Sequence, residues 1–331
     1  MRDPGANARY RPGHAGTPEE GWSRTTTLLV LAVIAAAAAL LAFHPGADRG
    51  TGGRAGAPTA TLEKVRRTGE ITLGHRENSI PFSYFDNRQH VAGYAHEIAM
   101  AIAREAGREA GVPAVKVKLV AVTSQTRIPL LMNNTIDLEC GTTTNNLARA
   151  RSVAFTTNYF IAGTRLLVRR DSGILDFDDL RGRNVVVSAG TTSEIALRQH
   201  NVRHRLGIRI IAARDHGDAF VALEFGKAVA FMSDDAILFG EMSKAKRPDD
   251  WHVVGTPLTR EVYACALRKG DPAFKALADR TIRTMMRDGR MRTLYARWFQ
   301  SPIPPRRVNL EVPFGADLAE LYAHPNDRPL Q

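Results

Sequence analysis

A run of hydroxyl and amide side chains, followed by an arginine, is the first part of this sequence that could bind an anion. Within GTTTNNLARARSVAFTTNYF (141–160), Thr142 and Thr144 lie just after a β-rich stretch, and Arg149 follows Thr142 by seven residues. Hydroxyls and backbone N–H groups at a strand end, facing an arginine one or two helical turns further on, can hold one carboxylate. An ordinary Thr/Asn helix cap with a solvated arginine explains the same residues. The segment alone leaves both interpretations open.

Other charged or titratable side chains occupy similar positions. Arg76 and Arg127 each come just after a predicted strand, where ligand sites form in α/β proteins, and His216 lies in a short loop before a predicted helix. Asp234 lies at the end of another predicted strand and the start of a helix. Taken singly, an arginine is more often a surface residue and a histidine more often structural. Together they are consistent with a pocket for an anionic side chain.

The elements that would position these residues alternate along the chain. From about Thr61, short β-rich runs alternate with helical patterns, which is typical of an α/β fold with mostly parallel strands. The predicted strands are 71–75, 117–122, 137–141, 184–190, 208–213, 228–232, 251–255 and 262–269. Helices are predicted at 94–109, 235–246, 272–288 and 291–299. Thr191 followed by Glu194 is a capping box, which predicts a helix N-terminus whose free N–H groups attract carboxylates.

The composition limits the class of protein. The 331 residues are 44% hydrophobic, enough for roughly two lobes of ordinary domain size. The formal net charge is +11, but arginine is scattered through almost every segment and forms no basic stripe, so we predict no nucleic-acid partner. The two cysteines, Cys140 and Cys265, are too few for a disulfide scaffold and lack the CxxC spacing of a zinc site. We predict no metal and no cofactor.

The N-terminal part predicts export. Residues 28–43 are continuously apolar, follow an arginine-containing leader, and precede a Gly/Ala/Pro-rich stretch. As a helix they would span about 24 Å, a little short of a hydrocarbon core of roughly 30 Å, so a cleaved signal and an uncleaved membrane anchor are both compatible. We divide this part into a cytoplasmic leader (1–27), a signal or anchor helix (28–43) and a flexible linker (44–60). A buried soluble helix is the alternative, but the Ala-rich run has no polar face to offer water.

Seven stretches, in order along residues 61–331, resemble one known family. They are GHRENSIPFSYFDN (74–87), TSQTRIPLL (123–131), ECGTTTNN (139–146), SAGTTSE (188–194), ARDHGD (213–218), AVAFMSDDA (228–236) and SPIPP (301–305). They resemble the glutamate/aspartate-binding branch of the type II periplasmic solute-binding proteins, the family 3 extracellular proteins of ABC importers. The branch often has serine where this chain has Thr142, which adds a methyl group and keeps the hydroxyl. The resemblance implies two α/β lobes with a ligand cleft between them.

The resemblance also implies roles for residues in the matched motifs. Thr142 and Thr144 would contact the ligand, and Arg149 with Thr192 would hold its α-carboxylate. Asp234, assisted by Thr142, would pair with the α-ammonium, since a buried unpaired charge costs several kcal/mol. The distal carboxylate of the ligand would be surrounded by four side chains, those of Arg76, Ser124, Arg127 and His216.

The implied architecture sets limits for the lobes. One lobe would consist of residues 61–162 with 260–331, and the other of residues 163–259, joined by two crossovers. Cys140 and Cys265 fall on strands that this fold places side by side in one lobe. Either a disulfide or a pair of buried thiols is compatible with that position.

The implied function is extracytoplasmic capture of L-glutamate or L-aspartate for the permease subunits of an ABC importer. The protein would lie at the outer face of the cytoplasmic membrane or beyond it, secreted or anchored by residues 28–43. An enzyme and a receptor-type sensor on the same scaffold are the alternatives. An enzyme needs a nucleophile–base couple and a sensor needs a transmission domain, and the sequence indicates neither. We therefore expect a binding protein without catalytic activity.

Overall fold

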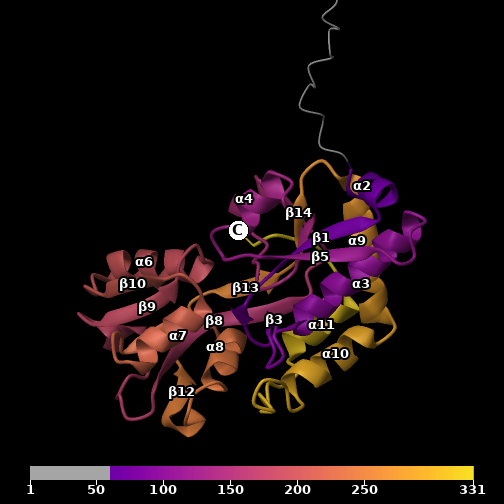
Figure 1. Cartoon of the computed structure of the whole chain (residues 1–331). Coiled ribbons are helices and arrows are strands. Elements are labelled where there is room, and N and C mark those ends of the chain that lie inside the picture. Colours follow the sequence, from indigo (N-terminus) through magenta and orange to yellow (C-terminus); the bar gives the residue numbers. More distant parts are fainter. Residues whose placement is uncertain (1–59, 331) are drawn as a thin grey trace, which may run out of the picture. The chain divides into compact units, whose positions relative to one another are not determined.

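A computed structural model of the chain describes residues 60–330, and Figure 1 shows its helices and strands. One sheet has the strand order β5-β1-β6-β14-β7. Its strands are β1 (Glu70–His75), β5 (Lys116–Ala121), β6 (Leu138–Glu139), β7 (Val153–Phe155) and β14 (Ala266–Arg268). β1 runs parallel to β5 and β6, whereas β14 runs antiparallel to β6 and β7. We call this sheet and the helices packed on it the first lobe.

A second sheet has the order β10-β9-β11-β8-β12, and β13 pairs with β8 outside this path. Its strands are β8 (Phe160–Arg169), β9 (Asn184–Ser188), β10 (Arg209–Ala213), β11 (Ala230–Asp234), β12 (Trp251–Val254) and β13 (Arg260–Tyr263). β9 is parallel to β10 and β11, and β8 is antiparallel to β11, β12 and β13. We call this sheet with its helices the second lobe, apart from β13 and the first residues of β8, which connect it to the first lobe.

Helices cover the sheets. In the first lobe they are α2 (Thr61–Thr68), α3 (Tyr94–Glu109), α4 (Arg127–Met132), α5 (Leu147–Ala150), α9 (Pro272–Arg287), α10 (Arg290–Phe299) and α11 (Ala316–Ala323). In the second they are α6 (Thr192–His204), α7 (His216–Glu224) and α8 (Asp235–Met242), with the short 3₁₀ turns η1 (Phe177–Leu180) and η2 (Pro248–Asp250). A small sheet of β2 (Asn78–Ser79), β3 (Ser83–Phe85) and β4 (Val91–Ala92) precedes α3.

Apolar periodicity explains the helical cover of the first lobe. In α3, Ile98, Ile102 and Ala106 recur at four-residue spacing and are fully buried. Side chains four residues apart lie on one helix face, so this face packs into the core while the other meets water. The strands β9 and β11 are instead buried along nearly their whole length, as expected where helices cover both faces of a sheet.

The chain passes from the first lobe to the second along β8 and returns along β13. These strands pair from Phe160 opposite Tyr263 to Gly163 opposite Arg260. Aromatic rings pack at the start of the pair: the ring centroids of Phe160 and Tyr263 are 5.7 Å apart, and those of Phe160 and Phe299 are 5.1 Å apart. Such ring pairs add stabilisation beyond the area that they bury. β8 therefore begins, and β13 ends, at one packed aromatic cluster.

Two expectations about the strands were wrong. Within residues 60–330, four strand pairings are parallel and seven are antiparallel, so the sheets are not mostly parallel. The reason is that β8 and β14 both run against their neighbours where the chain crosses between lobes. The sequence prediction also lacked β8 itself, and it joined β13 and β14 into one strand at 262–269.

The predicted leader, signal or anchor helix and linker (1–60) lie outside the described residues, apart from Ala60. Among residues 60–330, no helix combines the length and the apolar character that crossing a membrane requires.

Candidate functional site

The predicted site residues gather where strands end. Arg76 immediately follows β1, and Asp234 is the last residue of β11. Thr192 and His216 are the first residues of α6 and α7, which follow β9 and β10. The predicted N-terminus of α6 is confirmed: the Thr191 side chain accepts a hydrogen bond from the backbone N–H of Glu194 at 3.1 Å. Strand ends and helix starts meet in this way at the ligand-binding edge of α/β sheets.

Two buried arginines form one end of the site. Arg76 and Arg127 are each 1% exposed. The Nη1 atom of Arg76 donates to the Ser124 hydroxyl at 3.2 Å, and the Nη1 atom of Arg127 donates to the Thr143 hydroxyl at 2.5 Å. Thr143 in turn donates to a carboxylate oxygen of Glu139, also at 2.5 Å. The guanidinium of Arg127 is therefore linked through one hydroxyl to a fully buried carboxylate.

His216 lies at the same end and is 1% exposed. Its Nδ1 atom is 2.7 Å from the Ser188 hydroxyl. Burial, together with the charges of Arg76, Arg127 and Lys244, lowers the pKa of His216 well below its ordinary value, so the ring is neutral at pH 7. If the Ser188 hydroxyl donates to Nδ1, the proton of the neutral ring is on Nε2 and faces the arginines' end of the site as a donor.

Several nitrogens at this end have no hydrogen-bond partner among the described residues. They are Nη2 of Arg76, Nε of Arg127 and Nε2 of His216. Buried polar groups are nearly always hydrogen-bonded, and an unpaired one costs about 1–3 kcal/mol. Unpaired N–H groups on two buried guanidiniums, beside a ring nitrogen of His216 that also has no partner, are suited to a carboxylate.

The three arginines of the site repel one another. Burial first, and then the charge of Arg127, lowers the pKa of Arg76 to about 10 and that of Arg149 to about 9. Burial likewise lowers the pKa of Arg127 itself, and the carboxylate of Glu139 opposes this shift. All three remain protonated at pH 7. A concentration of positive charge of this kind is relieved by an anionic ligand.

Arg149 and two threonines form the other end, where the lobes meet. The Arg149 guanidinium donates to the Thr144 carbonyl at 3.1 Å and, more weakly, to the Gly190 carbonyl of the second lobe at 3.4 Å. The hydroxyls of Thr144 and Thr192 are 3.4 Å apart. A third inter-lobe bond, from the Asn78 amide to the Asp215 carboxylate at 3.1 Å, lies at the opposite end. Both ends of the site are thus closed by contacts between the lobes.

Asp234 is buried and bonded entirely to hydroxyls. Its Oδ1 atom accepts from Thr164 at 3.2 Å and from Ser193 at 3.3 Å, and its Oδ2 atom accepts from Tyr263. Burial first, and then the negative charge of Glu261, raises the pKa of Asp234 to about 7. A carboxyl group whose pKa is raised in this way is stabilised by a nearby cation.

The sequence prediction missed Glu139, Thr143 and Glu261. Glu139 and Thr143 lie inside the quoted motif ECGTTTNN, where a buried acidic residue next to apolar strand positions was the available signal. Glu261 immediately precedes the stretch 262–269 and is 3% exposed. An acidic residue near the head of an apolar strand was again the signal, but the prediction began the strand at residue 262, two residues after its start. Thr142, which lies between Gly141 and Thr143 in the sequence, is also buried.

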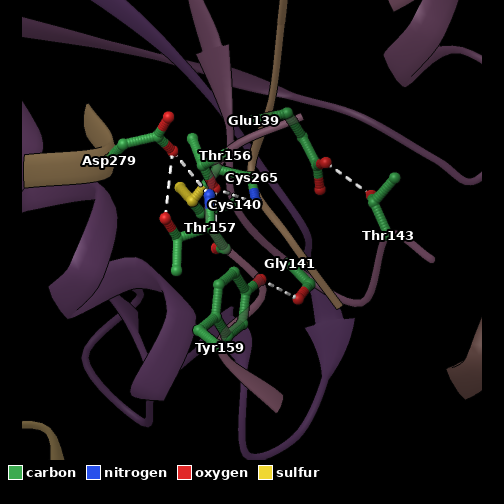
Figure 2. Close-up of a disulfide and its surroundings, with 9 residues drawn as sticks. All are labelled: Glu139, Cys140, Gly141, Thr143, Thr156, Thr157, Tyr159, Cys265 and Asp279. Carbon is green, nitrogen blue, oxygen red and sulfur yellow. Dashed lines mark hydrogen bonds between the residues drawn. A yellow bond between two sulfur atoms is a disulfide. The ribbon is translucent and has the colours of Figure 1, made fainter. Parts of the chain in front are cut away.

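A disulfide fixes the end of β6, as Figure 2 shows. It joins Cys140 to Cys265, which are 125 residues apart in the sequence. The Cys265 backbone also exchanges two hydrogen bonds with Thr156, each 3.0 Å long. Next to the disulfide, a Cβ atom on Gly141 would lie 2.5 Å from Oε1 of Glu139, so a larger residue there would displace the Glu139 carboxylate. The turn that carries the Thr142–Thr144 hydroxyls is therefore held covalently.

Removing this disulfide is expected to destabilise the protein without changing which ligands bind. Cross-linking residues this far apart restricts the unfolded chain, and the loss of such a bond costs about 2–5 kcal/mol. We expect the Cys140→Ser/Cys265→Ser variant to lose that much free energy of unfolding in urea titrations. A loss below about 0.5 kcal/mol would show that the disulfide contributes no stability.

The structure brings the predicted residues into two groups. Arg76, Ser124 and Arg127 lie near His216, and Arg149 lies near Thr144, Thr192 and Asp234. Arg127 interacts with both groups, because its charge lowers the pKa of Arg76 in one and of Arg149 in the other. The arrangement can hold one small molecule that is anionic at one end and carries both signs of charge at the other.

Comparison with known proteins shows which family this chain belongs to. Residues 71–301 match the family model of the bacterial extracellular solute-binding proteins, family 3. The chain is 49% identical over 277 residues to the glutamate/aspartate import solute-binding protein of Salmonella typhimurium, covering 83% of this chain and 92% of that protein. It is 49% identical over 271 residues to the L-glutamate/L-aspartate-binding protein of Pseudomonas aeruginosa, covering 82% and 90%.

Among solved structures, a mutant of ArgBP from T. maritima is 28% identical with a TM-score of 0.65, covering 72% of this chain and 99% of that one. The predicted α/β class, with two sheet-rich lobes, and the predicted family resemblance are confirmed. The chain belongs to family 3 of the bacterial extracellular solute-binding proteins.

Proposed function

We propose that this protein binds L-glutamate and L-aspartate between its lobes and delivers them to an ABC importer. The observation that carries the proposal is the set of unpaired nitrogens on Arg76, Arg127 and His216, two of them on buried guanidinium cations. An acidic side chain would accept all three. The similar proteins of Salmonella typhimurium and Pseudomonas aeruginosa, named for glutamate and aspartate, support the same ligand class.

The distal carboxylate of the ligand would lie between Arg76, Arg127 and His216, with Ser124 holding the Arg76 guanidinium at 3.2 Å. A neutral His216 suits this place because it donates from Nε2 without adding to the repulsion between the arginines. Charge-assisted bonds to a carboxylate are worth roughly 1.5–3 kcal/mol each. An amide in the same place would lose much of this energy, so glutamine and asparagine should bind far more weakly.

The α-carboxylate would be held by Arg149 and by the N-terminus of α6 at Thr192, where backbone N–H groups favour an anion. The α-ammonium would face Asp234 and Thr142. Thr144 lies next to Thr192 at the meeting of the lobes. Since Arg149 and Thr192 belong to different lobes, a ligand held by both would stabilise the closed arrangement, and a transporter could recognise that arrangement.

We further propose the lobe limits given above, residues 61–162 with 260–331 and residues 163–259. The protein would act outside the cytoplasm, either secreted or anchored by residues 28–43, with the ABC permease as its partner. N-terminal sequencing of the protein from its host separates the two versions, because cleavage leaves a start near residues 44–60. A full-length chain recovered from the cytoplasm would contradict both.

An enzyme on the same scaffold is the alternative. Contrary to the expectation from the sequence, Ser188 and His216 do form a hydroxyl–imidazole pair at 2.7 Å. A catalytic base must gain a proton, yet Arg76, Arg127 and Lys244 all oppose a charge on this ring. The pair is better suited to orienting a neutral donor, so we retain the binding function.

The function can be tested by screening the twenty amino acids for stabilisation of the purified protein against heat. A ligand that binds only the folded state raises its stability in proportion to the logarithm of ligand concentration over Kd. We expect L-glutamate and L-aspartate to raise Tm and their amides to leave it nearly unchanged. No shift with either acid, or an equal shift with glutamine, would contradict the proposal.

Binding is also expected to release a proton near pH 6.5. The pKa of Asp234 is about 7 in the folded protein against 3.8 for an ordinary aspartate. Between pH 3.8 and about pH 7, Asp234 therefore holds a proton in the folded free protein that it lacks in the unfolded chain. Because of this difference, the contribution of Asp234 to the free energy of unfolding falls as pH rises from about 4 to 7. A ligand ammonium favours the ionised carboxylate, so affinity should increase as pH rises from about 5.5 to 8.

The measurement is calorimetric titration in buffers of different ionisation enthalpy at pH 6.5. We expect the observed enthalpy to depend on the buffer for the natural protein and not for Asp234→Asn. A buffer-independent enthalpy in the natural protein would show that Asp234 binds the ligand already ionised.

A further inference from the structure

The proposed function gives Glu261 no contact with the ligand, although this residue is buried where the two lobes meet. It lies on β13, the strand that returns from the second lobe, and is 3% exposed. Its Oε2 atom accepts from Thr144 at 2.6 Å and from Thr192 at 3.0 Å, and its Oε1 atom accepts from Thr259 at 2.7 Å. One carboxylate thus holds hydroxyls that come from both lobes.

The two carboxylates of this corner have the same kind of environment. Asp234 accepts from three hydroxyls and Glu261 from three others, and among residues 60–330 the hydrogen bonds to both carboxylates come from hydroxyls. The nearby Arg149 gives its bonds to the carbonyls of Thr144 and Gly190 instead. The two negative charges therefore have no directly bonded cation in this network.

The direction of these hydrogen bonds determines what the corner can bind. A hydroxyl has one proton, and a carboxylate can only accept. Once Thr144 and Thr192 donate to Glu261, their oxygens offer only lone pairs to a third group. The hydroxyls of Thr144 and Thr192 can then act only as acceptors toward a ligand. This favours binding of a donor group such as ammonium and disfavours binding of a carboxylate.

We propose that Glu261 is a specificity-determining residue that, with Asp234, makes this corner a site for the α-ammonium group of the ligand. The proposal rests on the proposed function and adds to it a second carboxylate. Glu261 acts in two ways: its charge attracts the ammonium, and it orients the hydroxyls of Thr144 and Thr192 as acceptors. It also leaves Thr192 to serve the α-carboxylate through its backbone N–H and not through its hydroxyl.

The test compares L-glutamate with glutarate, which keeps both carboxylates and lacks the ammonium. In the natural protein we expect a strong preference for glutamate. In Glu261→Gln we expect the ratio of the two affinities to fall by about tenfold or more, with glutarate binding unchanged or stronger, since one charge-assisted bond is removed. Glu241→Gln is the matched control, because Glu241 on α8 is about as buried as Glu261 but pairs with Lys244; its ratio should stay unchanged.

A second pair of variants covers the case in which Glu261→Gln does not fold. Thr192 is only half-buried, so Thr192→Val should be tolerated, and we expect it to lower the same ratio by about threefold or more, with Thr192→Ser restoring it. A ratio that stays constant in Glu261→Gln, or in Thr192→Val where the former is unfolded, would overturn the role of Glu261. Failure of the natural protein to bind glutamate at all would instead refute the proposed function.

Discussion

Replacing Arg149 by alanine is expected to abolish measurable binding of every amino acid. Arg149 is assigned to the α-carboxylate, which all amino acids share, and its guanidinium is anchored on the carbonyls of Thr144 and Gly190. Removing one partner of a buried, hydrogen-bonded charge pair costs about 2–5 kcal/mol, which is roughly 30-fold to several thousandfold in affinity. Calorimetric titration of L-glutamate and L-aspartate into the variant measures this loss.

Arg198→Ala is the matched control for this experiment. Arg198 lies on α6 and forms an exposed ion pair with Glu194 at 2.9 Å. Such pairs contribute little, so its removal should change the affinity less than about threefold. An Arg149→Ala variant that binds as well as this control would show that Arg149 does not hold the α-carboxylate.

Replacing Arg127 alone is expected to damage both ligand selectivity and folding. Arg127 is linked through Thr143 to Glu139, and all three side chains are buried. Arg127→Met would leave the Glu139 carboxylate in the core without its cation, and an uncompensated buried charge costs about 3–5 kcal/mol. We expect a decrease of that order in the free energy of unfolding in urea.

The double variant Arg127→Met/Glu139→Gln separates these two effects. It removes both charges, so most of the lost stability should return. The preference for glutamate over glutamine should still fall by about tenfold or more, because the distal carboxylate has lost one guanidinium. A double variant that is stable and keeps the full preference would show that Arg127 supports the fold only and does not contact the ligand side chain.

Strand and helix positions could be predicted where the sequence pattern is local. The helix at 94–109 was predicted with the observed limits, because its apolar residues keep a regular spacing and Gly93 precedes it. β8 was missed because Gly163 and Thr164 interrupt its apolar alternation. The structure explains the glycine: a Cβ atom at Gly163 would lie 2.9 Å from the Cβ atom of Pro257. A requirement set by a residue so far away along the chain has no local signal.

The site shows the same limit. Residues in recognisable motifs, such as Arg76 and Arg149, could be proposed from the sequence, and the structure places each of them within electrostatic reach of Arg127. Glu261 could not, because its importance depends on hydroxyls at Thr144 and Thr192, which belong to different lobes. Which way a hydroxyl points is decided by such tertiary partners and not by neighbours in the chain.

The central claim is that the buried arginine end of the site selects an acidic side chain. Calorimetric titration of L-glutamate and of L-glutamine into the same preparation tests it most directly, since the two ligands differ only in a carboxylate and an amide. Losing two charge-assisted bonds at roughly 1.5–3 kcal/mol each predicts that glutamate binds at least about 100-fold more tightly than glutamine. Equal affinities for the two ligands would contradict the account.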